Sequence, residues 1–265
     1  MSTPPPTKAI LFLGATGGVA LSTLRRSLSA GYSCIALCRN PVTLTNLLSN
    51  NSSSSDENKT LPPNLTIIQG NAHSSDTLTS CLRHPSDPTR LVDTIVFSIG
   101  AKPTLRGMSD PHVCEKGMTA LLEALRTLRQ SDDNNNKPTG KPRLIAVSST
   151  GLSTLGRDLP WAMVPMYKLL LGQAHRDKKA MEDLVVEAGK GGEVEWTIVR
   201  GSLYTDGPAT EGKVRAGWED PVAGTRGEVP IGYTISREDV GKWIFEKCVE
   251  GSGEEWVGRA AVLTY

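Results

Sequence analysis

An apolar run that ends in a glycine-rich turn constrains the fold of this chain more than any other feature. Ala9-Ile10-Leu11-Phe12-Leu13 leads into Gly14-Ala15-Thr16-Gly17-Gly18-Val19-Ala20, and a helical pattern follows at once. A strand, a glycine turn and a helix in this order place a phosphate on the first backbone N–H groups of the helix. Gly14 allows the tight turn, Gly17 lets the phosphates approach, and Ala20 allows close helix–strand packing. The spacing G-x-x-G-x-x-A therefore predicts a dinucleotide-binding turn.

The second strand-like segment ends in a cation. Cys34-Ile35-Ala36-Leu37-Cys38 is followed by Arg39, and the chain has no Asp or Glu before Asp56. NAD-specific sites usually carry an acidic residue at this strand end, where it binds the ribose 2′-hydroxyl group. A guanidinium group suits a 2′-phosphate instead. The sequence therefore predicts NADP as the cofactor, with Arg39 as the residue that selects it; the alternative is a solvated loop charge.

These residues, together with later segments, resemble a known family. The glycine turn followed by Arg39-Asn40-Pro41 is similar to the atypical short-chain dehydrogenase/reductases, in particular to the NmrA-like NAD(P)-binding group that is frequent in fungi. The segments Ile68-Gln69-Gly70-Asn71, Thr197-Ile198-Val199-Arg200 and Ile235-Ser236-Arg237-Glu238-Asp239-Val240 fit this family too. The resemblance implies one Rossmann-like α/β domain over residues 1–265, with a doubly wound, mainly parallel sheet. A small C-terminal substrate cap is expected at residues 204–233.

Further cofactor contacts are expected where the strands end. Asn71 follows the third strand-like segment, where the family holds the adenine ring, although an asparagine can also simply stabilise its own turn. Ser98 follows the fourth, at the edge where doubly wound sheets bind ligands. The predicted cofactor-binding residues are Gly14, Ala15, Thr16, Gly17, Gly18, Val19, Arg39, Asn71, Ser98, Ile99, Gly100, Ser148 and Lys178.

The catalytic pair of the well-studied short-chain dehydrogenases is missing. In those enzymes a serine follows the fifth strand, and a Tyr-x-x-x-Lys pair lies on the next helix, where the lysine lowers the pKa of the proton-delivering tyrosine. None of the five tyrosines here has a lysine four residues later. By resemblance, Ser148 or Ser149 takes the serine position and Lys178 the lysine position. The tyrosine position then falls on Ala174, beside His175.

Three substitutes can supply the proton. Tyr167 lies in an apolar segment that can cover a pocket, His175 has a pKa near neutrality by default, and solvent is the third source. The competing interpretations are that Tyr167 is a core residue and that His175 is solvated at a charged helix start. The predicted catalytic residues are Ser148, Tyr167, Lys178 and His175, and no metal ligand is predicted.

Two functional hypotheses follow from the family and the missing pair. The first is an NADPH-dependent reductase of a small apolar or aromatic carbonyl, quinone or flavin-like substrate, in the manner of fungal relatives that act in secondary metabolism. The second is a non-catalytic NADP(H)-binding redox sensor of the NmrA type, which the missing Tyr-x-x-x-Lys pair favours. A lyase or isomerase that uses the fold without redox chemistry is a third possibility.

Composition bounds the partners. Lys plus Arg number 29 and Asp plus Glu 28, so the charge gives no reason to expect nucleic acid or an anionic membrane as a partner. Five scattered cysteines indicate neither disulfides nor a zinc site, and no signal peptide or membrane span is visible. We therefore expect a cytoplasmic protein with a small-molecule substrate, whose oligomeric state the sequence does not indicate.

Two polar, low-complexity segments are expected to be insertions that precede strands, at residues 50–63 and 131–142. Helices are expected over residues 76–84, 111–130, 177–188 and 237–249, from the spacing of their apolar residues. Both insertions should then lie at the amino-terminal rim of the sheet, away from the cofactor.

Overall fold

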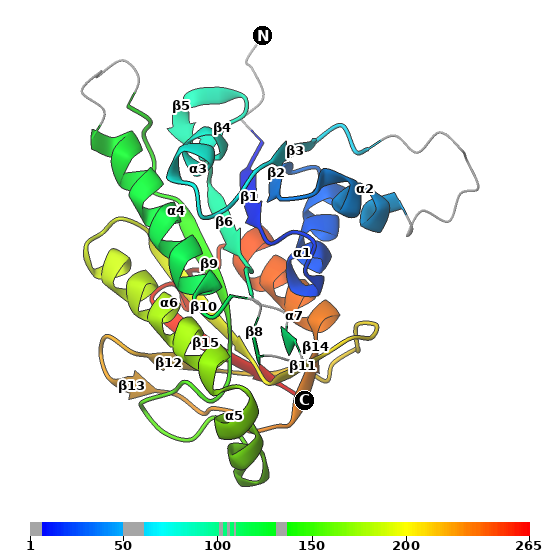
Figure 1. The fold of residues 1–265 in the computed structure, drawn as a ribbon, viewed down its shortest axis with the longest axis vertical. Coiled ribbons are helices and arrows are strands. Elements are labelled where there is room, and N and C mark those ends of the chain that lie inside the picture. Colours follow the sequence, from blue (N-terminus) through cyan, green and yellow to red (C-terminus); the bar gives the residue numbers. More distant parts are fainter. Residues whose placement is uncertain (1–6, 50–60, 101–102, 105–106, 109, 131–136) are drawn as a thin grey trace.

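The computed structural model describes residues 7–49, 61–100, 103–104, 107–108, 110–130 and 137–265. These residues form a nine-stranded sheet covered by helices on both faces (Figure 1). The sheet order is β13-β12-β15-β10-β9-β6-β1-β2-β3. Of the two predicted insertions, residues 50–60 and 131–136 lie outside the described part of the chain, so their placement stays a prediction.

Seven strands of this sheet run parallel and carry the apolar segments of the sequence. They are β1 (Ala9–Leu13), β2 (Ser33–Cys38), β3 (Leu65–Gln69), β6 (Thr94–Phe97), β9 (Arg143–Ser149), β10 (Glu195–Gly201) and β15 (Arg259–Thr264). Their central residues are mostly apolar because both faces of a parallel sheet are buried. The doubly wound, mainly parallel sheet is therefore confirmed.

Strand register brings the strand ends to one edge of the sheet. Leu13 of β1 pairs with Leu37 of β2 and with Phe97 of β6. Phe97 in turn pairs with Ala146 of β9. Because all four strands are parallel, the residues that follow them emerge at the same edge, which is where ligands bind in such sheets.

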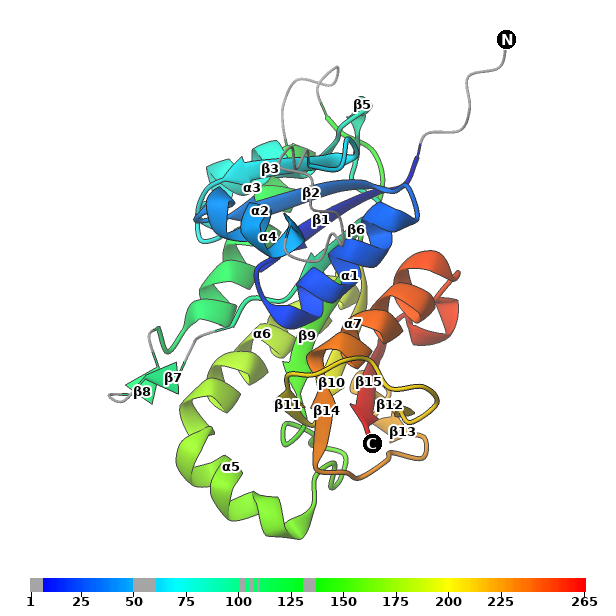
Figure 2. The ribbon, with the colours of Figure 1, turned by 90° about the vertical axis from the view of Figure 1, so that its right-hand side faces the viewer.

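The helices form two layers that pack on the two faces of the sheet (Figure 2). One layer holds α1 (Gly18–Ser29), α2 (Pro41–Ser49) and α7 (Arg237–Ile244), which continues as a π-helical turn over Phe245–Glu250. The other holds α3 (Ser75–Cys81), α4 (Val113–Gln130) and α6 (Gly172–Lys190). A short segment, η1 (Trp161–Met163) and α5 (Val164–Leu170), precedes α6 at the ligand-binding edge.

Two predicted helices have different bounds in the structure. The helix expected over residues 76–84 ends at Cys81, and a hairpin of β4 (Arg83–His84) and β5 (Asp87–Leu91) follows. The helix ends early because His84 packs against a distant part of the chain. Its side chain is buried, and its Nε2 atom lies 3.1 Å from the carbonyl oxygen of Thr7. The helix expected over residues 177–188 begins earlier, at Gly172, so α6 also carries His175.

The region expected to cover the substrate, residues 204–233, lies partly in the sheet. Its strand β12 (Arg215–Asp220) pairs antiparallel with β15, and β13 (Thr225–Arg226) pairs antiparallel with β12, so both extend the sheet. β11 (Leu203–Thr205) pairs with β14 (Thr234–Ser236) in a separate two-stranded sheet. Two further short elements are the hairpin of β7 (Pro103–Thr104) and β8 (Gly107–Met108), and η3 (Glu254–Trp256). The covering role itself stays a prediction.

All five cysteines are buried free thiols. Within the described ranges, no helix combines the length and the apolar character that a membrane crossing needs.

Candidate cofactor and catalytic site

The glycine turn after β1 has the shape that a phosphate cradle requires. Gly14 has a φ of +88°, and a Cβ atom at this position would lie 2.5 Å from the carbonyl oxygen of Ser98. The carbonyl oxygen of Gly14 accepts a 2.9 Å hydrogen bond from the N–H group of Gly17, the N-cap of α1. α1 has no acidic residue in its first turn, and within the described residues no side chain caps it. The first N–H groups of α1 and its dipole are therefore available to an anion, which fits a dinucleotide diphosphate.

The predicted adenosine contacts lie on the surface at neighbouring strand ends. Arg39 follows β2 and is exposed. Asn71 follows β3, and its side-chain oxygen accepts a 3.1 Å hydrogen bond from the N–H group of His73. This contact corresponds to the alternative interpretation of Asn71, in which the asparagine stabilises its own turn. Its contact with adenine stays a prediction, as does the role of Arg39.

The segment after β6 lies directly against the glycine turn. The N–H group of Ser98 donates to the carbonyl oxygen of Leu13 at 2.9 Å. Ser98 and Ile99 are half-buried, whereas Gly100 is exposed. The carbonyl oxygen of Ile99 accepts a hydrogen bond from the Cys114 thiol on α4 at 3.3 Å. The three predicted residues thus continue from the strand beside the glycine turn.

Lys178 contacts the end of β9, the strand that carries Ser148 and Ser149. The ammonium group of Lys178 donates to the carbonyl oxygen of Val147 at 3.1 Å. The hydroxyl oxygens of Ser148 and Ser149 are both buried, and neither has a hydrogen-bond partner among the described residues. A buried polar atom without a partner is costly, so such atoms indicate a site where a ligand or water completes the hydrogen bonding.

Tyr204 fixes this strand end from the other side. Its hydroxyl donates to the carbonyl oxygen of Ser148 at 2.7 Å and accepts from the N–H group of Gly201 at 3.2 Å. Burial raises the pKa of the Tyr204 hydroxyl well above its usual range, so the hydroxyl remains a donor. Sequence reasoning did not single out Tyr204, because these contacts join residues of different strands.

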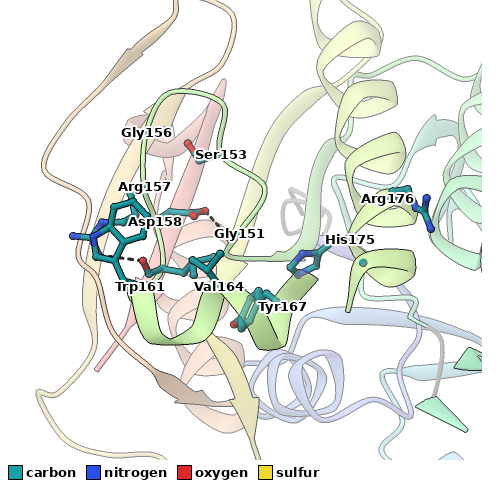
Figure 3. A pocket seen from close by; sticks show the side chains of 12 residues that line it. Gly151, Ser153, Gly156, Arg157, Asp158, Trp161, Val164, Tyr167, His175 and Arg176 are labelled. Atoms are coloured by element: carbon teal, nitrogen blue, oxygen red, sulfur yellow. Dashed lines mark hydrogen bonds between the residues drawn. The ribbon is translucent and has the colours of Figure 1, made fainter. Parts of the chain in front are cut away.

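Tyr167 and His175 face a cavity of about 670 Å³ (Figure 3). The two rings pack with their centroids 5.1 Å apart and their planes at 57°. A Cβ atom at Gly151 would lie 3.0 Å from each ring, so the loop after β9 approaches the pair closely. Leu159 and Val164 add apolar wall to the same cavity. The structure therefore brings the two predicted proton donors together.

Both rings are uncharged at neutral pH. Burial, and then the positive charge of Lys178, lower the pKa of His175 from 6.5 to about 4. Its Nε2 atom is buried and has no partner among the described residues. Burial raises the pKa of Tyr167, against a small opposing effect of Thr150, whose hydroxyl is 3.5 Å away. The interpretation of His175 as a solvated residue does not fit this environment, whereas Tyr167 is both buried and part of the cavity wall.

A buried ion cluster is linked to the loop that lines the cavity. Arg200 on β10 binds Glu182 of α6 through two hydrogen bonds of 3.0 and 2.7 Å, and its third nitrogen binds Glu219 of β12 at 2.7 Å. Ser153, which lines the cavity, donates to Glu219 at 2.7 Å. Only Arg200 stood out in the sequence, as part of a family motif. Bidentate pairing of this kind holds its partners in one geometry, so the cluster ties the cavity loop to α6.

Asp177 is a further residue that sequence reasoning missed. It is buried on α6, between His175 and Lys178, and its carboxylate accepts 2.9 Å hydrogen bonds from the N–H groups of Cys114 and Glu115. These are free N–H groups in the first turn of α4, so Asp177 caps α4 from another helix. No local signal could reveal this, because the partners are more than 60 residues apart.

Comparisons with known proteins agree with this geometry. The model of a family described as NAD(P)H-binding matches residues 14–249. A protein named reductase pytE, from Aspergillus terreus, is 39% identical over 283 aligned residues that cover 100% of both chains. A protein named oxidase pynE, from Aspergillus niger, is 34% identical over 280 residues, covering 96% of this chain and 98% of its own.

Solved structures share the fold at low identity. A short-chain dehydrogenase/reductase from Veillonella parvula, solved in complex with NADP, is similar with a TM-score of 0.64 and 16% identity, covering 97% of this chain and 94% of its own. The NAD(P)-binding family expected from the sequence is thus confirmed by the family model, and the solved structure confirms the Rossmann-like fold. This chain belongs to the NAD(P)H-binding family.

Proposed function

We propose that this protein is an NADPH-dependent reductase of a small apolar or aromatic carbonyl, quinone or flavin-like compound. The observation that carries the proposal is the Tyr167–His175 pair, which faces a cavity. The loop that lines this cavity follows Ser148 and Ser149, whose buried hydroxyls have no hydrogen-bond partner among the described residues. The family and the names of the Aspergillus relatives, a reductase and an oxidase, support an oxidoreductase role. The substrate class is inferred from the family resemblance, and the NADPH preference from Arg39.

The cofactor would be held along the ligand-binding edge of the sheet. The turn from Gly14 to Val19 would bind the diphosphate, Arg39 the 2′-phosphate, and Ser98 and Lys178 the nicotinamide ribose. Asn71 would contact the adenine. Bound NADPH supplies a hydride to the substrate. The protein would orient the cofactor and the substrate, provide an apolar wall and supply a proton to the substrate.

The proton would come from Tyr167. The phenol is protonated at neutral pH, so it can donate its proton to the oxygen that gains negative charge when hydride is transferred. His175 is neutral, and its Nε2 atom, which has no partner in the described part of the chain, can hydrogen-bond to the substrate or to a water that reprotonates the phenol. Leu159, Val164 and the indole of Trp161 would contact an apolar or aromatic substrate in the cavity.

The test is NADPH oxidation, followed by absorbance at 340 nm, with a panel of quinones, flavins and aromatic ketones. We expect turnover with at least one class, and weaker turnover with NADH. The sensor hypothesis has one specific observation in its favour: the amine of Lys178 contacts the Val147 carbonyl oxygen and no tyrosine lies four residues before it. A panel without any oxidation, combined with clearly different affinities for NADPH and NADP⁺, would establish the sensor instead.

A further inference from the structure

Arg237, the first residue of α7, lies across the start of α1. A Cβ atom at Gly18 would be 2.8 Å from Cδ of Arg237 and 3.0 Å from its Cβ. The Arg237 stem thus occupies the space that a side chain of residue 18 would take. Both ribbon views show α1 and α7 side by side (Figures 1 and 2). The side chain therefore begins at the edge of the glycine turn.

The guanidinium of Arg237 points along the same edge of the sheet. Its carbon lies 5.8 Å from the ring centroid of Tyr204, whose hydroxyl binds the carbonyl oxygen of Ser148. One nitrogen donates to the carboxylate of Asp206 at 2.7 Å. The charge thus lies between the turn after β1 and the end of β9, which is the span that a dinucleotide has to bridge from diphosphate to nicotinamide.

The backbone that carries Arg237 is fixed in place. The Ser22 hydroxyl of α1 donates to the carbonyl oxygen of Glu238 at 3.0 Å, and Arg26 of α1 binds the Glu238 carboxylate at 2.6 Å. The Ser236 side chain caps α7 by accepting from the N–H group of Asp239 at 3.0 Å. Arg237 therefore starts from a backbone position that is set relative to α1 before any ligand binds.

Asp206, by contrast, is a weak partner. Its side chain is 92% exposed, against 37% for that of Arg237. Solvent screens an ion pair of this kind and leaves it little net stability. A diphosphate offers the same guanidinium two charged groups with several oxygens in a partly enclosed site, and Arg is the side chain best suited to such groups.

We propose that Arg237 is a ligand of the dinucleotide diphosphate and that Asp206 competes for its guanidinium. The inference rests on the cofactor part of the proposed function and is independent of catalysis. It extends the binding site beyond the backbone N–H groups of the turn, to a side chain more than 200 residues further along the chain. The role also differs from that of Arg39, because the diphosphate is common to NADPH and NADH.

The experiment measures the dissociation constants of NADPH, NADH and 2′-AMP by calorimetry. 2′-AMP carries adenine and the 2′-phosphate but lacks a diphosphate. Arg237→Gln should weaken the binding of NADPH and of NADH by the same factor, about ten- to a hundredfold, since a charge-assisted contact is lost. Its affinity for 2′-AMP should stay unchanged. Arg237→Lys should recover part of the loss, and Asp206→Asn should tighten both dinucleotides about two- to fivefold.

Two controls separate this role from a structural one. Arg39→Asp should weaken the binding of NADPH and of 2′-AMP without weakening that of NADH. This selectivity is the opposite of that expected for Arg237→Gln. Urea unfolding of Arg237→Gln should match the wild type within the effect of one exposed ion pair. Unchanged dinucleotide affinities in Arg237→Gln, or an equal loss for 2′-AMP, would overturn the proposal while leaving NADPH turnover, and with it the proposed function, intact. A wild type that binds neither dinucleotide would overturn both.

Discussion

The imidazole of His175 packs against the phenol of Tyr167, with ring centroids 5.1 Å apart. One ring comes from α6 and the other from α5, whereas the amine of Lys178 is directed to the Val147 carbonyl oxygen at the end of β9. The lysine and the proton donor of a Tyr-x-x-x-Lys pair are thus separated here. In the proposed function Lys178 would bind the ribose, and the two rings, which line the cavity, would contact the substrate.

Tyr167→Phe tests the proposed proton donor. Losing a positioned general acid typically costs about 10²–10⁴-fold in rate, so we expect kcat to fall by that factor while the affinity for NADPH stays unchanged. His175→Gln keeps a hydrogen-bonding side chain and should cost less. Steady-state kinetics with the best substrate of the panel would measure both. If Tyr167→Phe retains full kcat, the proton comes from His175 or from solvent.

The lowered pKa of His175 makes the stability depend on pH. Between pH 6.5 and about 4 the unfolded chain binds a proton at this residue and the folded chain does not. Its contribution to the free energy of unfolding is therefore complete above pH 6.5 and is lost as the pH falls toward 4. Because the ring is only partly buried, we expect a loss of about 1–2 kcal/mol.

Urea unfolding at pH 7 and pH 4.5 would measure this loss, and His175→Gln is the control. The variant lacks the titrating ring, so its stability should fall less over the same interval than that of the wild type. Equal falls in the two proteins would mean that His175 titrates normally in the folded state.

Arg39→Asp tests the choice of cofactor. A well-made Arg–phosphate contact contributes about 1.5–3 kcal/mol, or roughly ten- to a hundredfold in affinity. The wild type should therefore bind NADPH more tightly than NADH, and the variant should reverse this preference because a carboxylate repels the 2′-phosphate and accepts from a 2′-hydroxyl. Fluorescence titration with both cofactors gives the ratio. Equal affinities in the wild type would refute the assignment.

Asp177→Ala removes the cap that α6 provides for α4. Two N–H groups lose a charged partner in a buried place, so we expect the free energy of unfolding to fall by about 1–3 kcal/mol. Asp183→Ala is the matched control on the same helix, because its side chain is 64% exposed and forms an ion pair with the neighbouring Lys179. That variant should lose less than about 0.5 kcal/mol. Similar losses would show that the cap contributes nothing.

Gly14→Ala tests the shape of the phosphate turn, and Gly31→Ala is its control. Both glycines have positive φ angles, +88° and +82°, so both variants incur the cost of that conformation, about 1–2 kcal/mol. Only Gly14 faces a carbonyl oxygen, that of Ser98, whereas nothing lies within 4 Å of a Cβ atom at Gly31. We expect Gly14→Ala to be the less stable in urea and to lose NADPH binding, which Gly31→Ala should retain.

The sequence alone determined the features whose signals are local. The apolar run before Gly14 and the leucine pattern after it predict the strand, the turn and α1, and the structure has all three. Arg39 and Ser98 could be assigned to one edge because parallel strands end together, which Leu13 pairing with Leu37 and Phe97 confirms. Such inferences need only residues that are neighbours in the chain, together with the rule that orders a doubly wound sheet.

Only the tertiary structure decided how the site is completed. The contact of Tyr167 with His175, the cap that Asp177 places on α4, and the stem of Arg237 across Gly18 each depend on how separate elements pack. The pKa of His175 is lowered for the same reason, since burial and the charge of Lys178 exist only in the folded chain. Hydrophobic periodicity predicts which face of a helix is buried. It carries no information on which distant side chain or backbone group that face meets, because desolvation and hydrogen bonding arise only when the elements come together.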